Sequence, residues 1–130
     1  AYQKLWRVAG VDHLHVNGLR NKFCESDESV INSARECLTP MFAPPAPGCE
    51  VMPVFSSGQW ADQAFDTYRL LGCAELIYTC GGGIVAHPGG VTAGVRSIRQ
   101  AWAAAVDGQT PEQAAAEHVE LRQAYEKFKS

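Results

Sequence analysis

The sequence predicts an α/β protein built on parallel strands. Short apolar segments alternate with amphipathic helical segments three times along the chain. Each apolar segment is followed at once by histidine, serine or glycine residues, as at the carboxyl ends of parallel strands. The 130 residues are 46% hydrophobic and 19% charged, which is the composition of a folded domain. Together these observations indicate parallel strands joined by helical crossovers.

The first strand–helix unit lies in residues 1–38. AYQKLWRVAG reads as the last turns of a helix, and GVDHLHV follows as a strand that places His13 and His15 on one face. The polar segment NGLRNKF predicts a flexible loop. SDESVINSARECL then predicts a helix with Ser26 or Asp27 as its N-cap and with apolar positions at helical spacing.

The second and third units follow a loop with four prolines, TPMFAPPAPG. VMPVFSSG predicts a short strand ending in a small polar turn, and ADQAFDTYRLLG predicts a helix closed by Gly72. AELIYTC predicts the third strand, which runs into CGGGIVAHPGG. The helix VTAGVRSIRQAWAAAVDG ends at Gly108 and is expected to bury one stripe, Val95, Ile98, Trp102 and Val106. In TPEQAAAEHVELRQAYEKFKS, Thr110 as N-cap and Pro111 at the first position predict a last helix.

Charge and cysteine content argue against several function classes. The net charge of −3, without a Lys/Arg cluster, argues against a nucleic-acid partner. No stretch approaches the ~20 apolar residues of a membrane span, and no signal-peptide pattern opens the chain. The five cysteines are widely spaced without a C-x-x-C pair, so the expected compartment is the reducing cytoplasm.

Three parallel strands make a poor independent domain, because the faces and edges of their sheet stay open. An eight-stranded barrel needs ~250 residues, far more than the 130 of this chain. The chain also begins with Ala1 inside a helical pattern. We therefore expect that further strands of the same fold are missing from residues 1–130.

The polar clusters that follow the strands are expected to meet at one edge of the sheet. They contain His13, His15 and Lys22, then residues 56–58, then residues 81–83. Backbone N–H groups in a glycine-rich turn form an anion nest, and a following helix N-terminus adds favourable dipole charge. The three glycines therefore predict either a phosphate site or a tight strand-to-helix turn without a ligand.

The side chains of these clusters leave several chemistries open. His13 and His15 could bind a metal, could supply one phosphate ligand and one acid–base group, or could be buried and hydrogen-bonded. Lys22 could stabilise charge that develops in a reaction, or be a solvated surface lysine. Ser56 could hydrogen-bond a sugar hydroxyl or phosphate, or belong to an ordinary turn. Cys80 is expected to be a packing residue and not a nucleophile.

Three segments together resemble a known family. GVDHLHVNGLRNKF, VMPVFSSGQW and IYTCGGGIVAHPGG resemble, in this order and spacing, the C-terminal part of the barrel of the ribulose-bisphosphate carboxylase/oxygenase (RuBisCO) large subunit. The closer similarity is to its non-carboxylating relatives, the RuBisCO-like proteins. The resemblance covers nearly the whole chain. It implies that residues 1–130 are strands six to eight of a (β/α)8 TIM barrel with their helices, without strands one to five and the N-terminal domain.

The resemblance assigns roles to three residues near the first strand. His13 falls on the histidine beside the reacting carbons, and His15 falls on the one that contacts a substrate phosphate. Lys22 falls on the lysine of the loop that closes over the substrate. The resemblance therefore implies His13 and Lys22 as catalytic residues and His15 as a phosphate ligand.

The resemblance also implies four binding residues after the second and third strands. Ser56 and Gly58 match a serine and a glycine that touch a substrate hydroxyl and phosphate. Gly81 and Gly82 match the backbone N–H pair that holds the other phosphate. Side chains would be absent at these glycines so that the backbone can reach the anion.

Departures from the carboxylase motifs argue against carbon dioxide fixation. The loop reads VNGLRNKFCE, SSGQW replaces a Ser-Gly-Gly turn followed by histidine, and AHPGG replaces a tryptophan-containing version. The resemblance implies an enediolate reaction on a phosphorylated keto-sugar or sugar acid, with decarboxylation or transcarboxylation of a substrate of the 3-oxo-isoapionate 4-phosphate type as the first expectation. An alternative is an enolase or isomerase acting on 2,3-diketo-5-methylthiopentyl 1-phosphate or 5-methylthioribulose 1-phosphate. A non-catalytic phosphate-binding remnant and a metal hydrolase using His13 and His15 also stay open.

The resemblance implies magnesium dependence that this chain cannot supply. The family binds Mg²⁺ through a Lys-x-Asp-Asp-Glu segment whose lysine is carbamylated, and no such segment occurs in this sequence. Mg²⁺ stabilises enediolate oxygens as a Lewis acid. We therefore expect no metal ligand within residues 1–130, an inactive chain when these residues stand alone, and a full-length magnesium enzyme that forms a homodimer or larger homo-oligomer.

Overall fold

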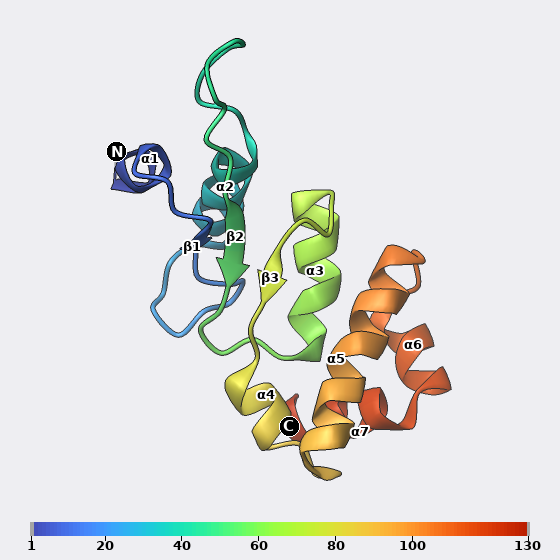
Figure 1. Cartoon of the computed structure of the whole chain (residues 1–130). Coiled ribbons are helices and arrows are strands. Elements are labelled where there is room, and N and C mark those ends of the chain that lie inside the picture. Colours follow the sequence, from blue (N-terminus) through green and yellow to red (C-terminus); the bar gives the residue numbers. More distant parts are fainter. Residues whose placement is uncertain (1, 130) are drawn as a thin grey trace.

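The structure is a computed structural model that describes residues 2–129 (Figure 1). Its strands are β1 (His13–His15), β2 (Met52–Phe55) and β3 (Ile77–Tyr78). They form one parallel sheet in the order β1-β2-β3. The predicted parallel α/β architecture is therefore confirmed, although β3 is shorter than the segment AELIYTC that predicted it.

Helices follow each strand, as the alternation predicted. They are α1 (Tyr2–Val8), α2 (Asp27–Leu38), α3 (Ala61–Leu71), α4 (Gly81–Val85), α5 (Gly90–Val106), α6 (Pro111–Glu117) and α7 (Val119–Phe128). Ser26 is the N-cap of α2, because its side chain accepts a hydrogen bond from Ser29 N–H. Gly72 ends α3 with φ of 85°, a conformation that favours glycine.

The strand register brings three carboxyl ends to one edge of the sheet. His15 pairs with Val54, and Phe55 pairs with Tyr78. Figure 1 shows that the loops after β1 and β2 and helix α4 all lie at this end, which we call the carboxyl edge. Helix α1 and the loop between α2 and β2 lie at the other end, which we call the amino edge. The segments that follow the three strands, with Lys22, Ser56 and the glycine triplet, belong to the carboxyl edge.

Two apolar clusters stabilise these elements. The first packs α2 against one face of the sheet, with Val30 and Phe55 fully buried. Leu14 packs against this cluster, whereas His13 and His15 lie on the opposite face of β1 and are exposed. The second cluster joins α3, α5, α6 and α7, and its buried members are Ala61, Ala64, Phe65, Ala101, Ala104, Ala105, Ala114 and Leu121.

The buried face of α5 differs from the predicted stripe. Val95 is 42% exposed and Val106 is 50% exposed. The buried residues of this helix are small, namely Gly94, Ser97, Ala101, Ala104 and Ala105. A Cβ on Gly94 would lie 2.4 Å from Ile84 O, so α4 and α5 approach too closely for a larger residue. Half of the predicted stripe is correct, since Ile98 and Trp102 are partly buried against the second cluster, while close helix packing selects small side chains for the rest of the buried face.

The predicted last helix is two helices. Thr110 and Gln113 form a capping box at the start of α6, as the Thr-Pro motif predicted. His118 then leaves helical geometry, with φ of −119° and ψ of 114°, and it caps both the end of α6 and the start of α7. It is half-buried at this junction rather than a plain surface residue. Within residues 2–129, no helix combines the length and apolar character needed to cross a membrane.

Candidate active site

His15 and Ser56 meet at the carboxyl edge. His15 is the last residue of β1 and Ser56 follows β2, and the parallel register places these strand ends side by side. His15 Nδ1 lies 3.3 Å from Ser56 Oγ. His13 lies on the same exposed face of β1, two residues earlier. The structure thus brings two of the predicted phosphate and hydroxyl ligands into contact.

The turn after β2 is fixed by a hydrogen bond to the loop after β1. Ser57 Oγ donates to Asn17 Oδ1 at 3.0 Å, and Asn17 Nδ2 donates to Glu25 Oε2 at 2.6 Å. Asn17, Ser57 and Gly58 all have positive φ, of 62°, 70° and 88°. Asparagine and glycine adopt this conformation most readily. The two loops therefore hold each other in an unusual shape that leaves Gly58 exposed.

Asn21 organises the loop that carries Lys22. Its Nδ2 donates to Gly18 O at 3.0 Å and to Glu25 O at 2.9 Å. Its Oδ1 accepts from the N–H groups of Phe23 and Glu25 at 3.0 and 3.2 Å. Asn21 is buried, whereas Lys22 and Phe23 beside it are exposed. The loop predicted as flexible is thus built around one buried amide.

Gln59 joins the same loop to the third strand. Its side chain is 2% exposed, and Nε2 donates to Leu19 O at 2.9 Å. A Cβ on Gly18 would lie only 2.2 Å from this amide, so a larger residue there would have to displace the Gln59 side chain. Tyr78 from β3 donates to Trp60 O at 2.9 Å. The polar interior of the carboxyl edge therefore connects all three strand ends.

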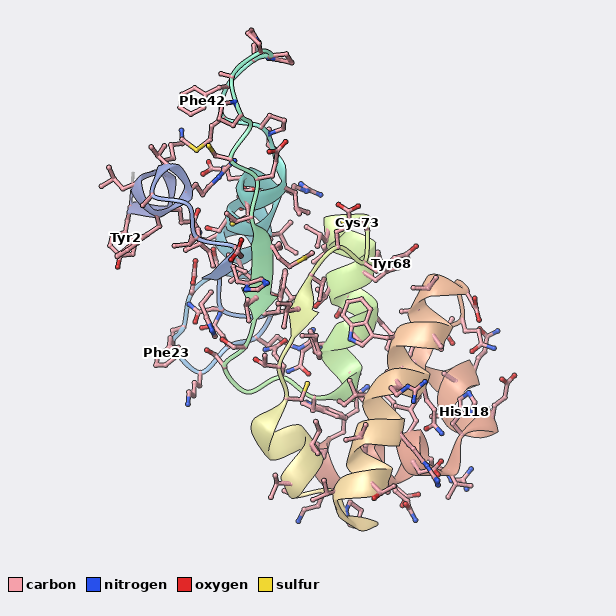
Figure 2. All side chains as sticks on the ribbon, in the orientation of Figure 1. Tyr2, Phe23, Phe42, Tyr68, Cys73 and His118 are labelled. Atoms are coloured by element: carbon pink, nitrogen blue, oxygen red, sulfur yellow. The ribbon has the colours of Figure 1, made fainter. Side chains whose placement is uncertain are left out.

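The loop lysine forms no ion pair with any residue in the range 2–129. Lys22 is exposed, and its Nζ lies 5.4 Å from the centroid of the Phe23 ring. Figure 2 shows Phe23 at the outside of the loop, pointing away from the sheet. Arg20, two residues before Lys22, is held instead by Asp62 at 3.0 Å and Asp66 at 2.7 Å. The base of the loop is thus tied to α3 while Lys22 projects into solvent.

The glycine triplet forms the first turn of α4. This short helix begins at Gly81, directly after Cys80. A Cβ on Gly83 would lie 2.6 Å from Trp60 Cβ, so packing requires glycine at that position. At Gly81 and Gly82 a Cβ would meet nothing within 4 Å among the described residues. Packing within the chain therefore explains the third glycine and leaves the first two free for close approach by a ligand.

The comparisons with known proteins agree with this geometry. A family model described as the ribulose bisphosphate carboxylase large chain, catalytic domain, matches residues 1–128. The chain belongs to the RuBisCO large-chain family. Its fold is the C-terminal part of that catalytic domain, as predicted from the three segments.

Two curated relatives illustrate the similarity. A 3-oxo-isoapionate-4-phosphate transcarboxylase/hydrolase from Xanthobacter autotrophicus is 54% identical over 123 residues, which are 95% of this chain and 29% of that protein. A 3-oxo-isoapionate-4-phosphate decarboxylase from Rhizobium etli is 48% identical over 128 residues, which are 98% of this chain and 30% of that protein. The chain thus spans less than a third of the length of these curated relatives.

Solved RuBisCO-family structures have the same fold over this region. A RuBisCO-like protein from Burkholderia fungorum is 49% identical with a TM-score of 0.93, covering 98% of this chain and 31% of that chain. The dimeric archaeal RuBisCO from Hyperthermus butylicus is 32% identical with a TM-score of 0.79, covering 98% and 31%. Both the carboxylase and the RuBisCO-like protein therefore share this arrangement of strands and helices.

The residues of the three RuBisCO-family motifs follow the strands that the sequence predicted for them. The roles assigned to these residues stay predictions. The structure brings these residues to the carboxyl edge: His15, Lys22, Ser56, Gly58, Gly81 and Gly82. His13 lies on the same face of the sheet as His15 but at the start of β1. Sequence reasoning missed three buried or half-buried polar side chains that hold them. Asn21 lies in the segment predicted as a flexible polar loop. Glu25 and Gln59 lie in the segments VNGLRNKFCE and SSGQW, which the sequence marked only as departures from the carboxylase motifs.

The structure also bears on the predicted packing role of Cys80 and on the possible metal ligands His13 and His15. Cys80 is buried, and burial raises the pKa of its thiol to about 12, so it is a packing residue as predicted. His13 and His15 have no third metal ligand close by, because residues 2–129 contain no group of three or more His, Cys, Asp or Glu side chains that could hold a metal ion. The described residues therefore do not fit the Mg²⁺ site that the family implies.

Proposed function

We propose that this chain forms the phosphate-binding part of a RuBisCO-like enzyme that acts on a branched sugar-acid phosphate. The proposed reaction is decarboxylation or transcarboxylation of a substrate of the 3-oxo-isoapionate 4-phosphate type, without fixation of carbon dioxide. The observation that carries the proposal is the 48–54% identity to relatives named for this substrate, over 95–98% of this chain. Identity to the archaeal carboxylase is lower, at 32%.

The residues at the carboxyl edge suit two anionic groups of such a substrate. His15 and Ser56 present an imidazole and a hydroxyl 3.3 Å apart, which can bind one phosphate or hydroxyl group. Gly81 and Gly82 offer open backbone to the other anionic group. Gly58, which lies between Ser56 and Gly81 in the sequence, is also exposed. His13 is proposed to lie beside the reacting carbons. Lys22 is proposed to stabilise negative charge that develops on the substrate.

The proposal includes parts of the protein that this chain does not supply. The full-length enzyme is proposed to be a magnesium-dependent homodimer or larger homo-oligomer, with Mg²⁺ ligands outside residues 1–130. The similarity to a dimeric archaeal RuBisCO supports the oligomer. The five free cysteines support a reducing compartment, which we propose is the cytoplasm.

The test is the activity of the full-length protein and its Lys22→Ala variant on 3-oxo-isoapionate 4-phosphate with Mg²⁺. We expect the wild type to release carbon dioxide from this substrate. In the variant kcat should fall by about 10²–10³-fold, the usual loss when a group that stabilises transition-state charge is removed. The free energy of unfolding should not change, since Lys22 is exposed and forms no ion pair among the described residues.

Lys4→Ala is the matched control, because Lys4 is also exposed but lies on α1 at the amino edge. It should retain full activity. A wild type that is inactive on this substrate, but that enolises or isomerises another keto-sugar phosphate, would replace the substrate proposal and leave the family assignment intact. A Lys22→Ala variant as active as Lys4→Ala would remove Lys22 from the catalytic residues.

A further inference from the structure

A continuous chain of polar contacts runs from His15 to Glu25. His15 Nδ1 lies 3.3 Å from Ser56 Oγ, which lies 3.4 Å from Ser57 Oγ. Ser57 Oγ lies 3.0 Å from Asn17 Oδ1, and Asn17 Nδ2 lies 2.6 Å from Glu25 Oε2. The chain crosses from the loop after β1 to the turn after β2 and back. We call these five residues the relay.

The carboxylate at its end determines how Asn17 is oriented. An ionised carboxylate only accepts hydrogen bonds, so the group 2.6 Å from Glu25 must be the amide N–H₂ of Asn17. The reverse orientation would place two acceptor oxygens against each other. Ser29 Oγ donates to the other carboxylate oxygen at 2.7 Å and holds Glu25 in this position. The carbonyl oxygen of Asn17 therefore faces Ser57.

Counting protons then fixes the direction of every bond in the relay. Each serine hydroxyl has one proton to donate. Ser57 donates its proton to Asn17 Oδ1, so Ser57 Oγ accepts from Ser56. Ser56 has then donated its own proton, so its Oγ can only accept from His15 Nδ1.

We infer that Glu25, acting through this relay, fixes the neutral form of His15 as the tautomer with its proton on Nδ1. Glu25, Asn17 and Ser57 are then positioning residues, since they act on the site through His15 and Ser56. A histidine whose second nitrogen is oriented by a hydrogen-bonded partner is a general device for setting a tautomer. Here the orienting carboxylate is four hydrogen bonds away from the ring.

The consequence is a defined nitrogen facing the site. His15 Nε2 has no hydrogen-bond partner within residues 2–129, and the side chain is exposed. In the Nδ1–H tautomer this nitrogen carries a lone pair. It can accept the proton of a phosphate monoanion: the phosphate O–H bond breaks, an Nε2–H bond forms, and an imidazolium faces a phosphate dianion. This consequence rests on the proposed function, whereas the tautomer itself does not.

The test is nitrogen-15 magic-angle-spinning NMR of the full-length protein labelled at histidine, without substrate, at a pH where His15 is neutral. His15→Asn identifies the His15 signals. Asn17→Gly and Ser57→Gly each break the relay while keeping a residue that tolerates positive φ. We expect the wild type to be mainly Nδ1–H, and each variant to shift the tautomer ratio toward Nε2–H by about fivefold, the effect of one ordinary hydrogen bond.

Cys24→Gly is the matched control. Cys24 lies in the same loop with φ of 60° and does not belong to the relay, so glycine there gives the backbone the same freedom. Its tautomer ratio should equal that of the wild type. A wild type that is mainly Nε2–H would overturn the inference, as would relay variants whose ratio does not move or a control that moves equally. Because no turnover is measured, an incorrect substrate assignment cannot produce any of these outcomes.

Discussion

At both edges of the sheet buried polar side chains hold loop backbone in place, but these side chains are neutral amides at the carboxyl edge and include a cation at the amino edge. At the carboxyl edge, Asn21 and Gln59 hold loop backbone in place while Lys22 and His15 stay exposed. At the amino edge, the chain buries its cation. Arg7 of α1 is 4% exposed and donates to three backbone carbonyls, those of Glu36, Thr39 and Cys49.

The three carbonyls that accept hydrogen bonds from Arg7 belong to the end of α2 and to the proline-rich loop that follows it. Carbonyl groups at a helix C-terminus have no intrahelical partner, and a cation there also interacts favourably with the helix dipole. All three nitrogens of the guanidinium are therefore committed within the chain. A cation that is 4% exposed and held by three backbone carbonyls has little surface to offer a ligand. The comparison teaches that burial against backbone carbonyls gives Arg7 a structural role, whereas Lys22 stays exposed beside the buried neutral amide of Asn21.

The largest effect should come from removing the amino-edge cation. Arg7→Ala leaves three carbonyls without their donor, at distances of 2.7 Å from Nε to Cys49 O and 2.6 Å from Nη2 to Thr39 O in the native protein. We expect the free energy of unfolding to fall by about 3 kcal/mol, the range for breaking a buried hydrogen-bonded charge. Urea denaturation of the full-length protein measures it, and hydrogen exchange should quicken in residues 39–50.

The control for this variant is Arg99→Ala. Arg99 is an exposed arginine of α5, and we expect its loss to change the free energy of unfolding by less than about 0.5 kcal/mol. If Arg7→Ala were equally mild, the amino edge would not depend on its buried cation. Arg7→Lys should recover part of the stability, because an ammonium keeps the charge but cannot reach three carbonyls in the guanidinium geometry.

The glycine triplet gives a second, smaller effect within the carboxyl edge itself. Gly83→Ala would force a Cβ to within 2.6 Å of Trp60 Cβ and 2.8 Å of Gln59 O. We expect a loss of about 2 kcal/mol in the free energy of unfolding, typical of overpacking. Gly81→Ala meets open space and improves helix propensity, so stability should be unchanged or higher by up to about 1 kcal/mol.

Activity should be more sensitive to substitution at Gly81 than stability is, because Gly81 has open space beside it and Gly83 does not. In the proposed enzyme Gly81→Ala should lower kcat/KM by on the order of 10–100-fold, because a methyl group displaces the anion from the backbone. Steady-state kinetics beside thermal unfolding of the same two variants provides both readouts. Equal stability losses at Gly81 and Gly83 would mean that packing, and not a ligand, explains the whole triplet.

The glycine triplet also shows how far the sequence could predict this structure. A strand before the glycines and a helix after them were predictable from apolar periodicity, because burial of one face leaves a regular pattern. Which of the three glycines serves packing was not predictable, since Trp60 and Gly83 are brought together only by the tertiary fold. The same reason applies to α5, where close contact with α4 makes Gly94 part of the buried face while Val95 and Val106 are exposed.

The positions of site residues at strand ends were predictable from the sequence. The buried side chains that hold the loops around them were not. His15 and Ser56 each follow the apolar pattern of a strand, so parallel pairing alone brings them together. Asn21 and Gln59 carry no periodic signal, because a buried amide that satisfies loop backbone can come from any position within reach. The burial of Arg7 was not predictable either, because an arginine on a helix is usually exposed.

The smallest effect concerns the ion pairs that tie the Lys22 loop to α3. Burial by itself would raise the pKa of the Asp66 carboxyl, but hydrogen bonds from Arg69 and Arg20 lower that pKa below its ordinary value. A carboxyl with a lowered pKa in the folded protein contributes stability above its unfolded pKa of about 4, and this contribution is lost as the pH falls through the folded value. Asp66→Asn should therefore weaken the protein at pH 7 and make little difference once Asp66 is protonated.

Solvent limits the size of this effect, because Arg20 and Asp66 are both more than a third exposed. We expect Asp66→Asn to lower the free energy of unfolding by only about 0.5 kcal/mol at pH 7, the range for exposed pairs. Asp12→Asn, at an exposed aspartate outside these pairs, is the control. Urea denaturation from pH 7 down to pH 3 should show the Asp66 difference shrinking below about pH 4. A difference that persists at low pH would mean that Asp66 holds the loop by packing rather than by charge.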